Sequence, residues 1–111
     1  MEELIQPHVA REEEFAFPPL SLLGALARGE VVPDPEGALA MTDRLKTELD
    51  RLVGEHNEIA GALQGLLAAA QGEDRPAVVE FAKEFIRHFE TEEDLLYPAA
   101  LLVGMMLRRR A

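Results

Sequence analysis

Apolar residues recur in this chain at alternating steps of three and four positions, and this spacing constrains the fold more than any other feature. Along the middle of the sequence the repeat comprises Leu45, Leu49, Leu52, His56, Ile59, Leu63 and Leu66. A helix completes a turn in about 3.6 residues, so these positions form one stripe that has to be buried against other helices lying nearly parallel or antiparallel to it. No useful length of the chain alternates with period two, which is the pattern of a half-buried strand. The spacing predicts an all-α, up-and-down helix bundle.

Glycine and proline divide the chain into three helical blocks. We expect these blocks at residues 1–30, about 38–71 and 76–110. Pro18 and Pro19 interrupt the first block, and Thr42 or Asp43 is the expected N-cap of the second. Because 111 residues support one core of modest size, we expect a single domain spanning residues 1–111.

The composition excludes several classes of function. The chain has no cysteine, so disulfides, thiolate metal sites and cysteine nucleophiles are ruled out. A formal net charge of -10 disfavours binding to the phosphate backbone of nucleic acids. No apolar run approaches the roughly 20 residues of a membrane span, and the first residues lack a signal-peptide pattern. We therefore expect a cytoplasmic protein whose partners include neither nucleic acid nor a membrane.

Five polar residues interrupt the apolar stripes, and they include every histidine of the chain. They are His8, Glu12, His56, His88 and Glu92. An ionised carboxylate inside a bundle needs a partner, because burying it unpaired costs several kcal/mol or more. The stripes contain no lysine or arginine that could supply one. A metal cation is the partner that fits this set, so all five residues are candidate metal ligands.

The spacing of these residues supports a metal site. His8 and Glu12 are four residues apart, as are His88 and Glu92, so each pair lies on one face of a helix and can hold an ion between imidazole and carboxylate. Nitrogen and oxygen donors without sulfur suit non-haem iron or manganese, and imidazole also suits zinc. A single pair of this kind is more often a structural feature. The repetition of the pair, with a third histidine on a stripe, favours metal binding.

An internal repeat connects the two pairs. Residues 8–24 match residues 88–104 at a constant offset. The first copy begins with HVAREEEFAFP and the second with HFETEEDLLYP. This self-similarity predicts a duplicated helical hairpin arranged about a pseudo-twofold axis. The residues after each motif are expected in the bundle core: Phe15, Phe17, Leu95, Leu96 and Tyr97, with Met105 and Met106 as fillers. Tyr97 could also donate a hydrogen bond to an oxygen ligand bound at the site.

The two motifs, with the Glu55-His56-Asn57-Glu58-Ile59 segment between them, resemble those of the hemerythrin-like, HHE cation-binding family. The resemblance extends from about Leu4 to Leu107 and implies a four-helix bundle with a mononuclear or dinuclear non-haem iron site. It also implies specific roles for the candidate ligands. The terminal ligands would be His8, His56 and His88. The bridging ligands would be Glu12 and Glu92. Glu13 and Glu93, each one residue later, could substitute for these two carboxylates.

The chain departs from the family pattern at its beginning. The family has a helix with its own histidine before the first motif, whereas Met1 here is only seven residues before His8. A second histidine that some members carry on the third helix would fall at Leu52 or Ala60. We therefore expect three main helices, with the first helix of the usual four absent. One metal ion or a vestigial site is an alternative to two ions.

A missing helix exposes an apolar groove between the first and third blocks, and such a face normally contacts a partner. We therefore expect a homodimer formed through this groove, unless the true start of the protein lies upstream of Met1. The resemblance implies binding or sensing of O2, NO or iron itself. The alternative function is a helical dimerisation or regulatory module whose metal site is vestigial or structural. A di-iron oxidase or peroxidase is the least favoured function, because the sequence shows no dedicated acid, base or substrate-binding motif.

Overall fold

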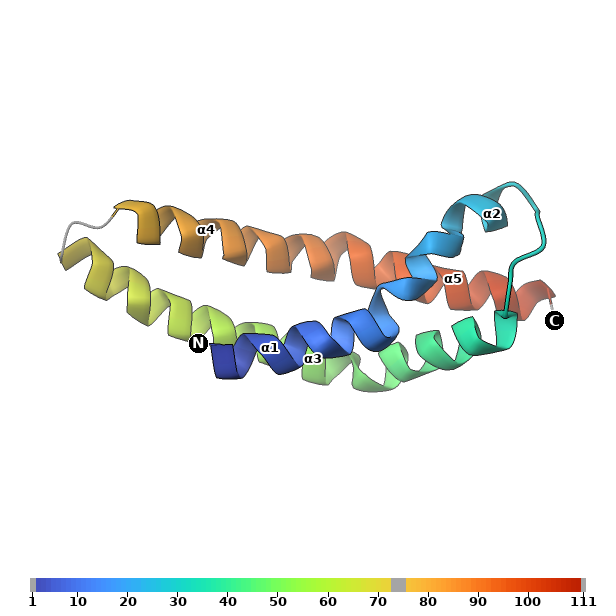
Figure 1. Cartoon of the computed structure of the whole chain (residues 1–111), viewed down its shortest axis with the longest axis horizontal. Helices are drawn as coiled ribbons and strands as arrows, with labels where there is room; N and C mark the ends of the chain where they lie inside the picture. The colour runs from blue at the N-terminus through green and yellow to red at the C-terminus, as the bar shows by residue number, and fades with distance from the viewer. Residues whose placement is uncertain (1, 73–75, 111) are drawn as a thin grey trace.

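The molecule is built along one long helix, α3 (Pro35–Gly72), as the computed structural model in Figure 1 shows. With about 1.5 Å of rise per residue, the 38 residues of α3 account for the longest dimension of the molecule, 57 Å. The structure describes residues 2–72 and 76–110.

Short elements precede α3 and one continuous helical rod follows it. The preceding elements are α1 (Glu2–Arg11), the π-helical turn η1 (Glu12–Ala16), the 3-10 turn η2 (Pro18–Leu22) and α2 (Leu23–Ala27). The rod consists of α4 (Pro76–Thr91), the π-helical turn η3 (Glu92–Leu96) and α5 (Tyr97–Arg110), and it runs antiparallel to α3 (Figure 1). Within the described ranges there is no strand, so the predicted all-α bundle with three main helices is confirmed. No described helix is long and apolar enough to cross a membrane.

The first turn of α3 is capped by Asp34, so the prediction that Thr42 or Asp43 caps this helix is wrong. Asp34 Oδ1 accepts a hydrogen bond from the backbone N–H of Gly37 at 3.1 Å, and Pro35 opens the helix, where a missing N–H costs nothing. Thr42 and Asp43 instead lie inside α3, and Thr42 is buried.

The apolar stripe of α3 is buried over most of its length, as predicted. Leu45, Leu52, Ile59 and Leu63 are each at most 1% exposed. The first two pack against η1 and the start of α5, whereas the last two pack against α4. The core is therefore a line of side chains along α3, covered by different elements at its two ends.

The stripe predicted for the third block is only partly buried. The same steps of three and four residues recur from Val78 to Met106 and predict that Phe81, His88 and Leu102 point inward, but all three are exposed, as is Leu66 near the end of α3. The reason lies in the number of helices. Helices α1 and α4 both pack against α3. Among the described residues, no further helix covers the side of α4 that carries Phe81 and His88.

The π-helical turn η3 accounts for a second group of differences. Leu95 was expected in the core but is 61% exposed, whereas Tyr97, two residues later, is 1% exposed. A π-helical turn contains an extra residue, so it rotates the residues that follow it relative to an α-helix. Phe15 is buried as predicted, and Phe17, Leu96 and Met106 are half-buried. Met105, predicted as a core filler, is 64% exposed.

Gly104 lets α5 approach α3 closely. A Cβ atom at this position would overlap the hydroxyl of Thr42 and lie 2.8 Å from the Thr42 Cβ. Both residues are buried, so neither can turn toward solvent to relieve the overlap. The helix contact therefore requires a residue without a side chain.

Replacing Gly104 by alanine is expected to destabilise the protein by about 1–3 kcal/mol, because overlap with Thr42 outweighs the roughly 1 kcal/mol of helix propensity that alanine contributes. Gly61→Ala is the matched control on α3, since an added Cβ there meets nothing within 4 Å. This control is expected to stabilise the protein by about 0.5–1 kcal/mol. Urea denaturation followed by circular dichroism measures both effects, and equal values for the two variants would contradict the close contact.

Candidate metal centre

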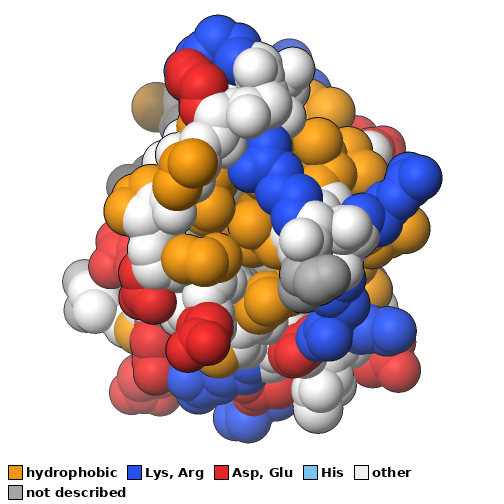
Figure 2. Space-filling model, turned by 90° about the vertical axis from the view of Figure 1, so that its right-hand side faces the viewer, with side chains coloured by type: hydrophobic (Ala, Val, Ile, Leu, Met, Phe, Trp, Pro, Cys, Tyr) orange, Lys and Arg blue, Asp and Glu red, His pale blue; other side chains and the backbone are white. Residues whose placement is uncertain are grey.

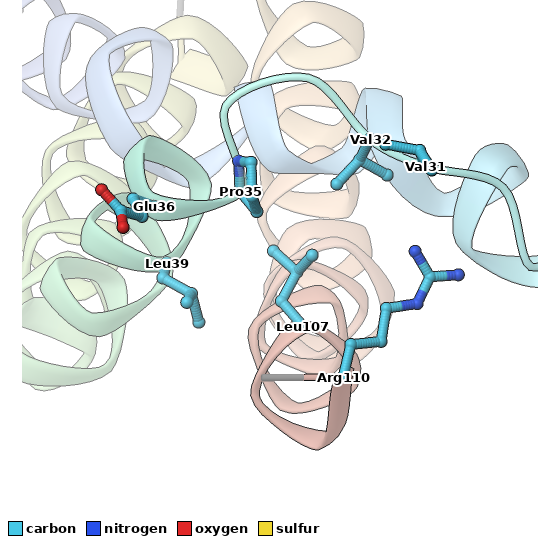
Figure 3. Close-up of a pocket in the computed structure, with 7 residues that line it drawn as sticks. All are labelled: Val31, Val32, Pro35, Glu36, Leu39, Leu107 and Arg110. Carbon is cyan, nitrogen blue, oxygen red and sulfur yellow. The ribbon is translucent and has the colours of Figure 1, made fainter.

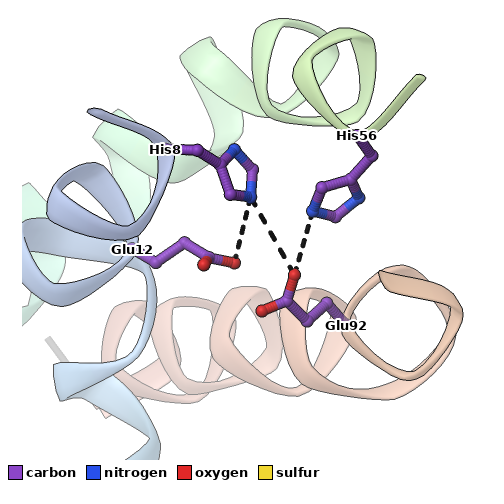
Figure 4. Close-up of side chains that lie close together, drawn as sticks. All are labelled: His8, Glu12, His56 and Glu92. Atoms are coloured by element: carbon purple, nitrogen blue, oxygen red, sulfur yellow. Dashed lines mark ion pairs between the residues drawn. The ribbon is translucent and has the colours of Figure 1, made fainter. Parts of the chain in front are cut away.

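Four side chains from three parts of the chain meet in the interior where α1, α3 and the rod come together (Figure 4). They are His8 of α1, Glu12 at the start of η1, His56 of α3 and Glu92 at the start of η3. All four are buried, with exposed fractions between 0% and 4%. One nitrogen or carboxylate oxygen from each residue lies within 4.8 Å of the other three. This is the geometry expected of ligands around one ion.

Glu92 is at the centre of the group. Its Oε1 lies 2.9 Å from His56 Nε2 and 3.9 Å from His8 Nε2. On the other side, His8 Nε2 lies 3.4 Å from Glu12 Oε2. Figure 4 shows the two imidazoles and the two carboxylates pointing toward one another, with His8 and Glu12 on one ribbon and His56 and Glu92 on two others.

Each of the two carboxylates begins a π-helical turn, at matched positions of the internal repeat. The backbone N–H of Phe17 bonds the carbonyl of Glu12, and that of Tyr97 bonds the carbonyl of Glu92, so each bond spans five residues instead of four. π-helical turns are rare and often lie at functional sites. In η3 the wider turn brings Tyr97 to the same side of the helix as Glu92. The periodicity of the sequence gives no sign of either turn.

A second layer of carboxylates holds the two imidazoles. His8 Nδ1 lies 3.0 Å from Glu55 Oε1, and His56 Nδ1 lies 3.2 Å from Glu93 Oε1. Arg11 donates a hydrogen bond to the same Glu55 oxygen at 3.2 Å. When Nδ1 donates its proton to a carboxylate, the lone pair of Nε2 is directed at the centre, as in metal-binding histidines. Sequence reasoning gave Glu93 only as a substitute ligand and gave Glu55 no role.

The electrostatics of the centre favour a positive charge in its middle. Burial raises the pKa of Glu92, but the imidazoles of His56 and His8 outweigh burial and hold that pKa well below its usual range. Burial lowers the pKa of His8, but Glu12 and Glu92 outweigh burial and raise it to about 9. Burial also raises the pKa of Glu12 and, together with the Glu12 carboxylate, that of Tyr97. The carboxylates thus stabilise positive charge at the centre, and a cation bound there would take the place of the proton on His8.

Three buried atoms at the centre test whether a cation fits. His8 Nε2 and both carboxylate oxygens of Glu92 have no hydrogen-bond partner among the described residues, although charged groups lie near them. Unpartnered buried polar atoms are uncommon and costly. Two imidazole nitrogens and two carboxylates suit iron, manganese or zinc. The residues present therefore fit a metal ion.

The structure brings four of the five predicted residues together and places the fifth, His88, at the edge. The side chain of His88 is 59% exposed, and its Nε2 lies 3.1 Å from Oε2 of Glu92, the oxygen not shared with His56. His88 faces a groove of about 430 Å³ between α1 and α4. The residues that line this groove are Ile5, Val9, Phe81, Glu84, Phe85 and His88. The predicted apolar groove between the first and third blocks is thus present.

A second cavity, of about 390 Å³, lies at the end of the bundle where α3 begins and α5 ends (Figure 3). Its lining is Val31, Val32, Pro35, Glu36, Leu39, Leu107 and Arg110. Figure 2 shows this end of the molecule, where apolar side chains lie among arginines. The Arg110 guanidinium donates to the backbone carbonyls of Glu30 and Leu26, at 2.7 and 3.4 Å. Arg110 therefore fastens the end of α5 to the loop after α2.

Comparison with known proteins agrees with the geometry. A family model of the hemerythrin HHE cation binding domain matches residues 1–100. No curated protein and no solved structure matches the chain. The matched range contains all four residues of the centre, His88, and the two carboxylates that support the imidazoles. Because the match covers nearly the whole chain, the protein belongs to the hemerythrin HHE cation-binding family.

Proposed function

We propose that this chain is a non-haem iron protein that binds or senses a small diatomic ligand, O2 or NO, or iron itself. The proposed inner ligands are His8, Glu12, His56 and Glu92. The observation that supports the proposal most directly is the convergence of one buried donor atom from each of these four residues within 4.8 Å of the others. Membership of a cation-binding family supports it independently.

Iron is proposed because the donors are imidazole and carboxylate without sulfur. Manganese and zinc accept the same donors and are the alternatives. When bound, iron supplies the electrons that a diatomic ligand accepts. The chain supplies the dry surroundings: Phe89 is buried and stacks on the His56 ring, with the ring centroids 4.2 Å apart. This stacking fixes the plane of the imidazole and excludes water from one side of the centre.

His88 is proposed as an outer ligand. Glu92 has one oxygen near His56 and the other near His88, so its carboxylate can serve two metal positions. The inner position has four protein donors, whereas the outer one has only His88 and Glu92 among the described residues. We therefore propose one strongly bound ion, and a second position that fills only weakly.

A helical regulatory module with a vestigial metal site is the alternative function. Under the iron proposal, the cation joins α1, α3 and the rod, so metal binding contributes to folding. Under the alternative, a chelator leaves the thermal stability unchanged. The two functions therefore differ in a quantity that is simple to measure.

We also propose that the chain forms a homodimer through the groove between α1 and α4. The groove is lined by Ile5, Val9, Phe81 and Phe85, and Phe81 is 51% exposed. A twofold interface needs only one kind of surface. Exposed charges of both signs, Glu84 and Arg87, lie on α4 beside the apolar side chains and can pair across such an interface. The net charge of -10 on each chain opposes the association at low ionic strength.

The first prediction from the proposed function concerns metal content. Reconstituted wild-type protein is expected to retain about one iron ion per chain after desalting, and Glu92→Ala about a tenth of that or less, because it removes oxygens from both metal positions. Glu90→Ala, which changes an exposed carboxylate two residues earlier, is the matched control.

His88→Ala is expected to keep the ion with about tenfold weaker affinity. Mass-spectrometric metal analysis measures these values, and equal iron in Glu92→Ala and wild type would contradict the proposal. A chelator is expected to lower the Tm of the wild type only.

The second prediction concerns the supporting carboxylates. Glu55→Gln is expected to weaken metal binding by about 10–100-fold, because an amide no longer fixes the orientation of His8 as a charged acceptor does. Glu58→Gln, an exposed change one helical turn away on α3, is expected to leave affinity unaltered. Competition titration against a coloured chelator gives both constants. An unchanged constant for Glu55→Gln would mean that the His8–Glu55 contact does not orient the imidazole.

The third prediction concerns assembly. Light scattering during size-exclusion chromatography is expected to show a dimer whose fraction rises with salt, because salt screens the repulsion between two acidic chains. Phe81→Ser is expected to give a monomer. Leu66→Ser, at an exposed leucine outside the lining of the groove, is the control and is expected to remain a dimer. A monomeric wild type at high concentration would exclude this interface.

A further inference from the structure

Tyr97 is a fifth buried polar side chain at the metal centre. It is 1% exposed, and its hydroxyl donates a hydrogen bond to Glu12 Oε2 at 2.8 Å. The same hydroxyl lies 3.2 Å from His56 Nε2. Tyr97 thus lies between two proposed ligands that come from different helices.

We propose that the Tyr97 oxygen is itself a metal ligand and that it makes the centre selective for a trivalent ion such as Fe(III). This inference rests on the proposed function, because it assumes that a metal occupies the centre, and within that function it favours sensing of iron itself over binding of O2, which requires Fe(II).

The distances between neighbouring donor atoms support this assignment. Tyr97 Oη, Glu12 Oε2, His8 Nε2, Glu92 Oε1 and His56 Nε2 follow one another in a closed ring. The five successive separations are 2.8, 3.4, 3.9, 2.9 and 3.2 Å. Neighbouring ligands of one ion with bonds of about 2.0–2.2 Å lie roughly 3 Å apart. The tyrosine oxygen therefore continues the ring of ligands, whereas a residue of the second layer would stand behind it.

The local fold also directs this side chain at the centre. Tyr97 follows Glu92 by five residues, and the π-helical turn places both on one side of the helix. The matching residue in the first repeat is Phe17, which has no hydroxyl and is only half-buried. The centre therefore receives a phenol from one half of the pseudo-symmetric bundle only.

Coordination replaces one bond by another. The O–H bond of Tyr97 breaks, an oxygen–metal bond forms, and the proton passes to solvent water, with no change in oxidation state. A phenolate is a hard, anionic oxygen ligand, so it favours a hard trivalent cation over Zn(II) or Mn(II). Together with two carboxylates the phenolate supplies three negative charges, which balance the three positive charges of Fe(III).

The experiment uses the fact that Tyr97 is the only tyrosine of a chain without tryptophan. Adding Ga(III) to the stripped full-length protein is expected to produce the ultraviolet difference spectrum of one tyrosinate per chain. Adding Fe(III) is expected to produce a visible phenolate-to-iron charge-transfer band. Tyr97→Phe, which keeps the packing of the ring, is expected to lose both signals and to bind Fe(III) about 10–100-fold more weakly, with a smaller change for Zn(II).

The outcomes separate this inference from the function on which it rests. Stoichiometric metal in the wild type without a tyrosinate signal would overturn the role of Tyr97 and leave metal binding intact. No retained metal in either protein would overturn both. The wild-type difference spectrum decides the matter even if Tyr97→Phe proves unstable, and circular dichroism of that variant checks its fold.

Discussion

The rest of the structure depends on the interaction between the buried carboxylate of Glu92 and the imidazoles around it. An ionised carboxylate that is fully excluded from water is tolerated only where positive charge or hydrogen-bond donors surround it. Here the imidazoles of His56 and His8 surround the carboxylate, at 2.9 and 3.9 Å from one of its oxygens. Each imidazole comes from a different helix, so the helices can pack only in the arrangement that brings these groups together. Under the proposed function, stability of the fold and affinity for a cation are coupled, because the same groups contribute to both.

The internal repeat explains why the centre has a closed side and an open side. On the closed side, α3 contributes His56, which pairs with Glu93, and Glu55, which pairs with His8. The repeat relates His8 to His88 and Glu93 to Glu13, and both of these counterparts are exposed on the other side, where no described helix covers them. The repeat thus supplies two equivalent sets of candidate ligands, of which α3 completes one. This asymmetry is the reason for proposing a single inner ion with an approach to it past His88.

Much of the fold could be predicted from the sequence, because it depends on periodic burial. The stripe from Leu45 to Leu63 and the repeated His-Glu pairs both follow from helical geometry, and so does the convergence of His8, Glu12, His56 and Glu92. Three features could not be predicted in the same way. The π-helical turns change the register locally, so Leu95, predicted in the core together with Tyr97, turns outward while Tyr97 is buried as predicted. The exposure of His88 depends on which helices surround α4, a property of the assembled bundle. The supporting role of Glu55 depends on a contact between α1 and α3 that no single-helix pattern contains.

The position of the centre along α3 follows from where three elements overlap. Beyond the centre, the end of α3 pairs with α4, and Leu63 and Ala82 belong there to a core cluster that reaches Phe89 at the centre and has Ile5 of α1 packed against it. Two helices bury only one stripe each, which is why Leu66 and Phe81 remain exposed in this part of the molecule. A cation held where α1 joins the pair would restrain the hairpin at its base, because it links α3 to the rod through His56 and Glu92. The metal centre therefore lies at the boundary between the well-packed and the sparsely packed part of the bundle, where one added ion constrains the most chain.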